Sequence, residues 1–494
     1  MSPRSLVRRS VAAVAGTAVA AGGLLAFSPA PAAQAADPTA QNAGLAWLGK
    51  QFDGANLIAG DVTSTIEYAL SATALGATPD ARAKLGVDAA LESYVEKGDQ
   101  NVAMAAIFYE TVGADPTDTP AGNLIVKLEA AIDDTTGELT TYPYTYGQAL
   151  AVQALRGSEA ATETDKAYDF LVGKQRCADG GFGWGATDDP ATCTSSSDET
   201  SLGIRAISGM AGSEDVVASA SAWLAGQHRN GAFGYISWVA PYDFVESANS
   251  TGLAAEALRL AGRTEAAASA AAWVQRHQTV GTACDGKLSV EKGAIPADVS
   301  YVSEGRTFGI TAETRSSWTL ATAQAVRALP SATSAAGAPS LSVPAFVHVS
   351  DLFDVRASGL APSGNACVTL GGSSAWVQGG SASLKAPAGT GRHLVTLTTI
   401  GGSVTATVHA LAATTLKVKA PSTVKAKKKA TIKVKRLAAG ESVTVKIGKK
   451  KATGTANAQG VATVKVKVTK RGKAKVKVKG QFPDRRGKAT IRVV

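Results

Sequence analysis

Acidic residues at the starts of alanine-rich segments are the first candidates for chemistry in this sequence. Asp198 and Glu199 are adjacent and open one such segment. Two carboxyl groups facing each other across a cleft, one of them with a raised pKa, are what glycoside hydrolysis requires. Asp and Asn at helix starts are also ordinary N-caps, each worth about 1 kcal/mol. For Asp61, Asp198 and Asn249 the sequence leaves helix capping and ligand binding as alternatives. Further acidic candidates at such starts are Asp99, Asp243, Glu246 and Glu313.

Aromatic residues gather near the same segment starts. They are Tyr142, Tyr144 and Tyr146, then Trp184, then Tyr235 and Tyr242, and finally Trp318. Flat aromatic faces stack on rings while the tyrosine hydroxyls hydrogen-bond, which suits sugars, cyclic lipids or a macrocycle. Packing of loops is the alternative. We predict a ligand site made by these aromatic residues together with Asp198, Glu199 and Asn249, and we assign no catalytic residue.

No metal ion or cofactor is predicted. Asp189 and Cys193 are the two residues that most resemble a pair of zinc ligands. No histidine lies in a segment that would bring it beside them as a third ligand. Zinc needs three or four converging ligands and a deprotonated thiol. The sequence also has no Gly-x-Ser-x-Gly, His-Glu-x-x-His or phosphate-binding loop motif.

The four cysteines indicate an oxidising compartment. Cys177 and Cys193 flank the glycine-rich loop 178–192, and we predict a disulfide between them worth roughly 3 kcal/mol in the chain-entropy model. Cys284 and Cys367 fall in regions of different composition. For these two, a second disulfide and a pair of free buried thiols remain alternatives.

A repeated phrase organises the segments that carry these residues. The phrase Ala46-Trp47-Leu48-Gly49-Lys50-Gln51 returns at 170–175, 222–227 and 272–277, and glycine-rich turns follow at 179–184 and 230–235. One such helical unit of about 40–50 residues cannot bury its own apolar face, so the repeat predicts a stacked helical array.

The periodicity predicts twelve helices in six pairs. The outer helices are expected near 40–51, 80–95, 121–133, 160–175, 215–228 and 265–278, and their partners are expected to begin near Asp61, Asp99, Tyr146, Asp198, Asn249 and Ser316. Small residues on the partner helices permit close packing, and aromatic residues on the outer helices cover them. We expect two concentric rings of helices.

The phrase at 170–184, which ends in Asp179-Gly180-Gly181-Phe182-Gly183-Trp184, resembles the repeat of the squalene–hopene cyclase and protein prenyltransferase β-subunit superfamily. The resemblance covers about 40–329 and implies an α/α toroid of six helix pairs. It implies a cavity at the mouth of the inner ring, between the inner-helix N-termini and the loops after the repeat phrase. It also implies that Gln175 and Gln227 cap a neighbouring helix and stack against Trp184 and Tyr235 as scaffold.

The catalytic residues of that superfamily are missing. Protonation of an alkene by a terpene cyclase needs an Asp-x-Asp-Asp acid, and neither Asp133-Asp134 nor Asp188-Asp189 has the leading acid or continues as a diphosphate motif. Aromatic residues make up only 6% of the chain, which disfavours carbocation chemistry. The resemblance extends to cobalamin carriers, in which a toroid binds its ligand without catalysis.

Composition changes sharply after Leu329. Residues 330–340 are rich in Pro, Ser, Ala and Gly and are interpreted as a linker. Alternating Val, Thr and Lys patterns predict one β-sandwich module over 341–412 and a second over 413–494. The second module resembles bacterial immunoglobulin-like modules. Residues 414–494 hold 25 of the 50 Lys and Arg residues but only two acids, Glu441 and Asp484. Lysines on one face of alternating strands predict binding to an anionic surface polymer, while edge protection and solubility are the alternative.

The N-terminus resembles a secretory signal. Arg4, Arg8 and Arg9 precede the uncharged run 11–27, and small residues follow up to Ala35. We interpret 1–35 as a signal peptide and 36–329 as the toroid, and expect a secreted protein associated with the cell wall.

Three functions remain from the sequence. The first is a non-catalytic exported protein that binds a small ring-bearing ligand, with no specific binding of nucleic acid. The second is a diverged enzyme of the terpene cyclase and prenyltransferase kind. The third is a polysaccharide-active enzyme, because α/α toroids also host glycoside hydrolases.

Overall fold

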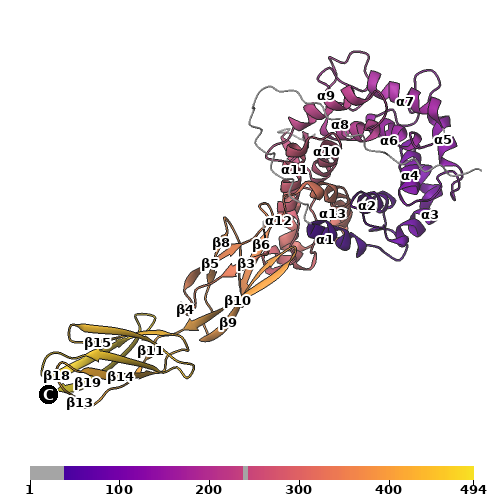
Figure 1. Cartoon of the computed structure of the whole chain (residues 1–494). Helices are drawn as coiled ribbons and strands as arrows, with labels where there is room; N and C mark the ends of the chain where they lie inside the picture. The colour runs from indigo at the N-terminus through magenta and orange to yellow at the C-terminus, as the bar shows by residue number, and fades with distance from the viewer. Residues whose placement is uncertain (1–37, 159, 237–242, 336) are drawn as a thin grey trace, which may run out of the picture. The chain divides into compact units, whose positions relative to one another are not determined.

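The computed structural model describes residues 38–158, 160–236, 243–335 and 337–494, so the predicted signal segment 1–35 lies outside the described residues. A mainly helical part is followed by a part made of β-sheets (Figure 1), which is the order of helical and β segments that the sequence predicts. Across the described ranges, no helix is long and apolar enough to cross a membrane.

Six helices of the described chain form a closed inner ring. They are α2 (Val62–Ala74), α4 (Asp99–Thr111), α6 (Thr145–Leu155), α8 (Ser197–Ile207), α10 (Ala248–Leu260) and α13 (Ala312–Ala325). Each packs against the next, and α13 packs against α2 (Figure 1). Small residues allow this close approach, because a Cβ on Gly252 of α10 would lie 2.4 Å from the carbonyl oxygen of Gln324 on α13.

A second set of helices covers the outside of the inner ring. These helices are α1 (Pro38–Gly49), α3 (Ala81–Val95), α5 (Leu124–Ala131), α7 (Ala161–Lys174), α9 (Glu214–Ala225) and α11 (Thr264–His277). Their apolar residues, such as the fully buried Leu48 and Leu171, face the inner helices.

The sequence did not predict some smaller elements. They are α12 (Val299–Phe308), the 3-10 helices η1 (Ala283–Val290) and η2 (Val326–Ser331), and the two-stranded sheet of β1 (Gly234–Ile236) and β2 (Phe244–Glu246). In α12 only Gly305 is buried, so no apolar stripe marks this helix in the sequence.

One hydrogen-bond scheme recurs at three inner-helix starts. The N-cap side chains are those of Asp61, Ser196 and Ser247. Four residues later, Thr65, Thr200 and Thr251 accept hydrogen bonds from the backbone N–H groups of Ile58, Phe182 and Phe233, at 2.8, 2.9 and 3.0 Å. Because these three apolar side chains are fully buried, the scheme fixes the preceding turn under the next inner helix.

The capping alternative is therefore right for Asp61 and wrong for Asp198 and Asn249. Ser196 and Ser247 are the caps of α8 and α10, and Asp198 and Asn249 lie two residues further into their helices. A serine hydroxyl satisfies the free N–H groups of the first turn as well as a carboxylate does. Another explanation is needed for Asp198 and Asn249.

A buried ion cluster holds η2 against the inner ring. Arg327 is 1% exposed and pairs with Glu67 of α2 and with Glu256 of α10, the latter at 3.2 Å. Its Nε donates to the hydroxyl of Ser71 at 2.8 Å. Burial lowers the pKa of Arg327 to about 10, and the paired carboxylates compensate the buried charge.

The first β-sandwich has two sheets around one apolar core. One sheet contains β3 (Ser340–Ser342), β5 (Leu352–Ser358) and β8 (Ser381–Lys385); the other contains, in order, β4 (Phe346–His348), β10 (Gly402–Leu411), β9 (Gly391–Thr399), β6 (Ala366–Leu370) and β7 (Ser373–Trp376). Val355 and Leu384 from the first sheet and Leu397 from the second are fully buried in this core. Cys284 of η1 and Cys367 of β6 form a disulfide, so the alternative of two free buried thiols is wrong.

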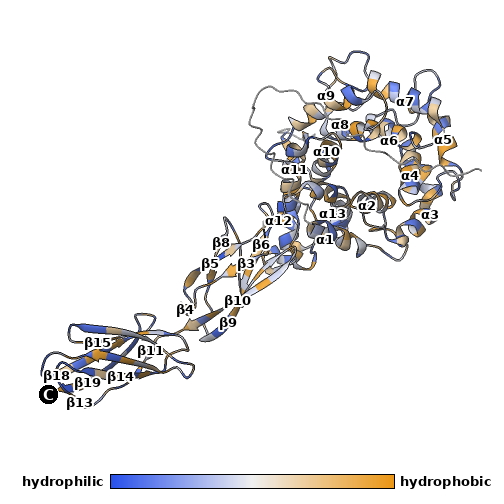
Figure 2. Ribbon diagram, in the orientation of Figure 1, coloured by the Kyte–Doolittle hydropathy of each residue, from blue (hydrophilic) through white to orange (hydrophobic). Residues whose placement is uncertain are grey.

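The last β-sandwich has the alternation that its sequence predicts. One sheet contains β12 (Lys417–Lys419), β14 (Lys429–Lys435) and β17 (Ala462–Lys467); the other contains, in order, β11 (Thr414–Thr415), β19 (Arg485–Val493), β18 (Gly472–Lys479), β15 (Ser442–Ile447) and β16 (Lys450–Thr455), with β13 (Thr423–Val424) also paired to β19. Along β17, Val464 and Val466 are buried and Lys465 and Lys467 are exposed. Hydrophobic and hydrophilic residues alternate along such strands (Figure 2), so every second side chain contributes to the core.

Candidate functional site

A pocket of about 1010 Å³ lies at the start of α8, between the turns that follow α7 and α9. Its lining includes Trp184, Ser195, Asp198, Glu199, Trp223, Gln227, His228, Arg229, Tyr235, Ile236 and Phe244. Two acids, a cation and several aromatic rings therefore meet in one hollow. The pocket lies at an inner-helix N-terminus and beside the turns of two repeat phrases, where the resemblance implies a cavity.

Asp198 is the most perturbed acid of the pocket. Burial raises its pKa to about 6; the hydroxyl of Ser250 acts against this, and the neighbouring Glu199 adds to the rise. The first turn of a helix ordinarily stabilises a carboxylate, so desolvation outweighs the helix dipole here. The Oδ1 of Asp198 and the Oγ of Ser250 are both buried, and the described residues offer them no clear hydrogen-bond partner other than each other.

Glu199 is held by the cap of its own helix. The hydroxyl of Ser196 donates to Oε2 of Glu199. The pKa of Tyr142 is raised by burial, then by Tyr144, and then by Glu199. Glu199 therefore lies close enough to the tyrosine cluster to interact with it.

A chain of aromatic contacts leads from the pocket to the inner ring. Trp184 is 57% exposed and stacks on Tyr144, with ring centroids 4.7 Å apart and planes 16° apart. Tyr144 contacts Tyr142 edge to face at 4.8 Å, and Tyr142 contacts Tyr146 at 6.4 Å. Burial raises the pKa of Tyr146. The exposed face of Trp184 is thus supported from behind by a packed partner.

The predicted site residues divide into groups. Trp184, Asp198, Glu199 and Tyr235 line the pocket, and Tyr142, Tyr144 and Tyr146 adjoin it through the stack on Trp184. Asn249 instead donates to Oε1 of Gln324 at 2.7 Å. Trp318 is 1% exposed and lines a different pocket of about 320 Å³. Tyr242 lies outside the described residues.

Among the lining residues that the sequence did not predict are Trp223, His228 and Arg229. Trp223 was assigned to the outer covering. The Arg229 guanidinium lies 4.3 Å from the centre of the Phe244 ring, a cation–π contact that orients it. His228 and Arg229 come directly after Gln227, which ends the repeat phrase. Their position next to the phrase is the feature of the sequence that could have identified them as pocket residues.

The roles implied for the two glutamines are not observed. Gln227 donates to the carbonyl oxygen of Trp223 in α9, the helix that it follows, at 3.1 Å. Gln175 is buried, and neither of its amide atoms has a hydrogen-bond partner in the described structure. Trp184 stacks on Tyr144. Gln148 of α6 does tie helices together, because its Nε2 donates to the carbonyl oxygens of Gly137 and Ala167.

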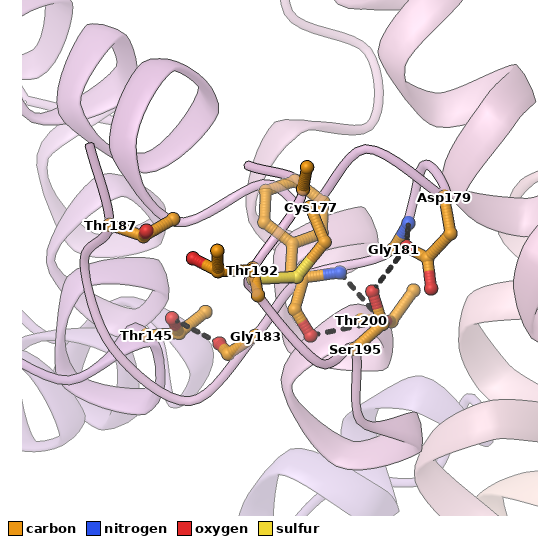
Figure 3. The surroundings of a disulfide bond; sticks show 12 residues. Thr145, Cys177, Asp179, Gly181, Gly183, Thr187, Thr192, Ser195 and Thr200 are labelled. Carbon is orange, nitrogen blue, oxygen red and sulfur yellow. Dashed lines mark hydrogen bonds between the residues drawn. A yellow bond between two sulfur atoms is a disulfide. The ribbon is translucent and has the colours of Figure 1, made fainter. Parts of the chain in front are cut away.

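The predicted disulfide between Cys177 and Cys193 is confirmed (Figure 3). Thr194 and Ser195, which follow Cys193 directly, line the pocket. Gly183 lies directly against the disulfide, because a Cβ at this position would be only 2.4 Å from the sulfur of Cys193. In the same loop the hydroxyl of Ser195 donates to Asp179 at 2.6 Å (Figure 3). The bridge occupies the Cys193 thiol, so this residue is not a metal ligand. Within the described ranges, no three His, Cys, Asp or Glu side chains are grouped as a metal site.

Comparison with known proteins gives no assignment. No protein-family model matches the chain, and no curated protein matches it. Among solved structures, a protein from Actinoplanes is similar at 16% identity over 59% of this chain and 98% of its own, with a TM-score of 0.40. A glycosidase is similar at 12% identity over 59% and 95%, with a TM-score of 0.38. The D0-D1 domain of intimin is similar at 17% identity over 30% and 94%, with a TM-score of 0.14. At these TM-scores the likenesses carry no inference about activity.

Proposed function

We propose that this protein is an exported binding protein whose helical ring, an (α/α)6 toroid, binds a ring-bearing ligand in the pocket at α8 without catalysis. One observation carries the proposal. The supported and exposed ring of Trp184 shares a pocket with the desolvated carboxyl group of Asp198.

The two features suit different parts of one ligand. A flat indole face takes up the apolar face of a sugar or another saturated ring. The carboxyl group of Asp198 lines the pocket and accepts hydrogen bonds from ring hydroxyls. A hydrogen bond to a charged group contributes about 1.5–3 kcal/mol.

A polysaccharide-active enzyme is the second candidate. The raised pKa of Asp198, about 6, suits a general acid near neutral pH. Glycosidases, however, place two carboxyl groups on opposite sides of the scissile bond, about 5–9.5 Å apart. The acids in the described lining, Asp198 and Glu199, come from consecutive positions of one helix. This arrangement favours binding.

The test combines a glycan and macrocycle binding screen with calorimetry on the secreted protein. Trp184→Ala and Asp198→Asn are each expected to weaken binding about 10- to 100-fold, since each 1.4 kcal/mol is a factor of ten. Trp376→Ala, in β7, removes a half-buried tryptophan outside the pocket and is the control. Equal affinity of Trp184→Ala and wild type would refute the pocket. Turnover of a bound glycan that is lost in Asp198→Asn would establish the second candidate.

The proposal also covers the other parts of the chain. Two disulfides support an oxidising, extracellular setting. We assign 36–329 to the toroid, 330–340 to the linker, and 341–412 and 413–494 to immunoglobulin-like sandwiches. The second sandwich, with 25 basic and two acidic residues over 414–494, is proposed to hold the protein to an anionic polymer of the cell surface.

A further inference from the structure

Four lysines form a straight row across one sheet of the last sandwich. Lys451 of β16 is opposite Lys446 of β15, Lys446 is opposite Lys477 of β18, and Lys477 is opposite Lys488 of β19. All four are exposed. Residues directly opposite in neighbouring strands point to the same side of a sheet, so the row presents four adjacent ammonium groups.

The rest of this face adds positive charge. The exposed bases beside the row on the same face are Lys473, Lys475, Lys479, Arg486 and Arg492. The two acids of residues 414–494 do not neutralise them. Glu441 is fully buried against Arg485 at 2.7 Å, and Asp484 bonds His348 at 2.7 Å.

Such a row opposes folding, because like charges directly opposite each other in a sheet are destabilising. Solubility alone is served equally well by mixed charges. A face that keeps nine bases and no acid is therefore suited to an external anion.

The chemistry of the face favours a phosphate chain. Neighbouring strands lie about 4.8 Å apart, so the row is about 14 Å long and runs across the strands. Thr444, Thr453 and Thr490 flank it on the same face and supply hydroxyl donors of the kind that bind phosphate oxygens. The only aromatic residue of 414–494 is Phe482, which contacts His348. Stacking of nucleic-acid bases therefore has no platform here.

We infer that the β16-β15-β18-β19 face binds a linear polymer with one phosphodiester per repeat, and that the polymer lies along the lysine row. The inference rests on the proposed binding of an anionic polymer by this module, and it adds the face, the direction and the chemical class.

The experiment measures binding of the full secreted chain to poly(glycerol phosphate) over a salt series. The row variant carries Lys446→Gln, Lys451→Gln, Lys477→Gln and Lys488→Gln. The charge-matched control carries Lys417→Gln, Lys419→Gln, Lys433→Gln and Lys435→Gln, which are exposed on the opposite sheet. Duplex DNA and hyaluronate are the comparison polymers, and thermal unfolding verifies that both variants fold.

The row variant is expected to lose about 100- to 1,000-fold in affinity at 0.1 M salt, and the slope of log K against log salt is expected to flatten by about 3. The control variant is expected to lose less than about 5-fold, because the opposite face is about a Debye length away. Equal losses in both variants would overturn the lysine row while leaving polymer binding intact. Tighter binding of DNA or hyaluronate would overturn the phosphodiester assignment. Absence of binding by wild type would overturn the proposed polymer function and this inference with it.

Discussion

Replacement of Asp198 by Asn is expected to make the helical ring more stable at neutral pH. The ordinary pKa of the carboxyl is 3.8, and burial raises it to about 6. A group whose pKa is higher in the folded state favours folding while it is protonated. Its contribution is therefore complete below about pH 4 and is lost as pH rises through 6.

The magnitude follows from the shift. About two pKa units at 1.36 kcal/mol each give about 3 kcal/mol by pH 8. Asn carries no charge, so the gain of Asp198→Asn over wild type is expected to be near zero at pH 4 and about 3 kcal/mol at pH 8. For a domain of this size the gain corresponds to a rise in Tm of about 6–10 °C.

The assay is thermal unfolding followed by circular dichroism at 222 nm, which reports the helices, at intervals from pH 4 to pH 8. Asp118→Asn removes one exposed carboxylate between α4 and α5 and is the control. A difference between Asp198→Asn and wild type that stays constant with pH would refute the burial argument. So would a variant less stable than wild type at pH 8. Asp198→Asn is thus expected to gain stability and to lose ligand binding, and this opposition is typical of residues in functional sites.

Two further predictions concern the scaffold. Arg327→Met removes the described cation partner of the buried Glu67 and leaves Glu256 with Arg205 at 3.5 Å, and is expected to cost about 3–5 kcal/mol in urea unfolding; recovery is expected when Glu67 is also made neutral, and a loss below 1 kcal/mol would contradict the cluster's role. Joint replacement of Cys177 and Cys193 by Ser opens a loop with a sequence separation of 16 and is expected to cost roughly 3 kcal/mol. Limited proteolysis should then cut within 178–192, whereas the pair Cys284→Ser and Cys367→Ser should leave that loop protected.

The repeat phrase together with the helical periodicity was sufficient to place most of the helices of the described chain. Predicted outer helices near 80–95 and 160–175 correspond to α3 (Ala81–Val95) and α7 (Ala161–Lys174). Local periodicity suffices there because each helix buries one apolar stripe. The strands of the last module were predicted equally well, because the alternation of Val and Lys indicates which side chains face the core. The helix α12, with one buried residue, carried no such stripe.

The sequence predicted the candidate site only in part. Trp184, Tyr235, Asp198 and Glu199 were selected for their type and for their position near the repeat, and the structure brings them into one pocket. Asn249 was selected by the same rule, yet it bonds Gln324 of α13. The two cases look alike in sequence because both residues stand two places after a capping serine.

Local pattern by itself determined the helices, the alternating strands, the charge division and the first disulfide, because each of these depends on residues near one another in the chain. Only the tertiary structure decided which acid is desolvated, that Arg327 meets Glu67 and Glu256, and that four lysines from separate strands form one row. Those properties depend on register and burial between segments far apart in sequence. A slip of one residue in the register of any of these strands would move its lysine of the row to the other face of the sheet.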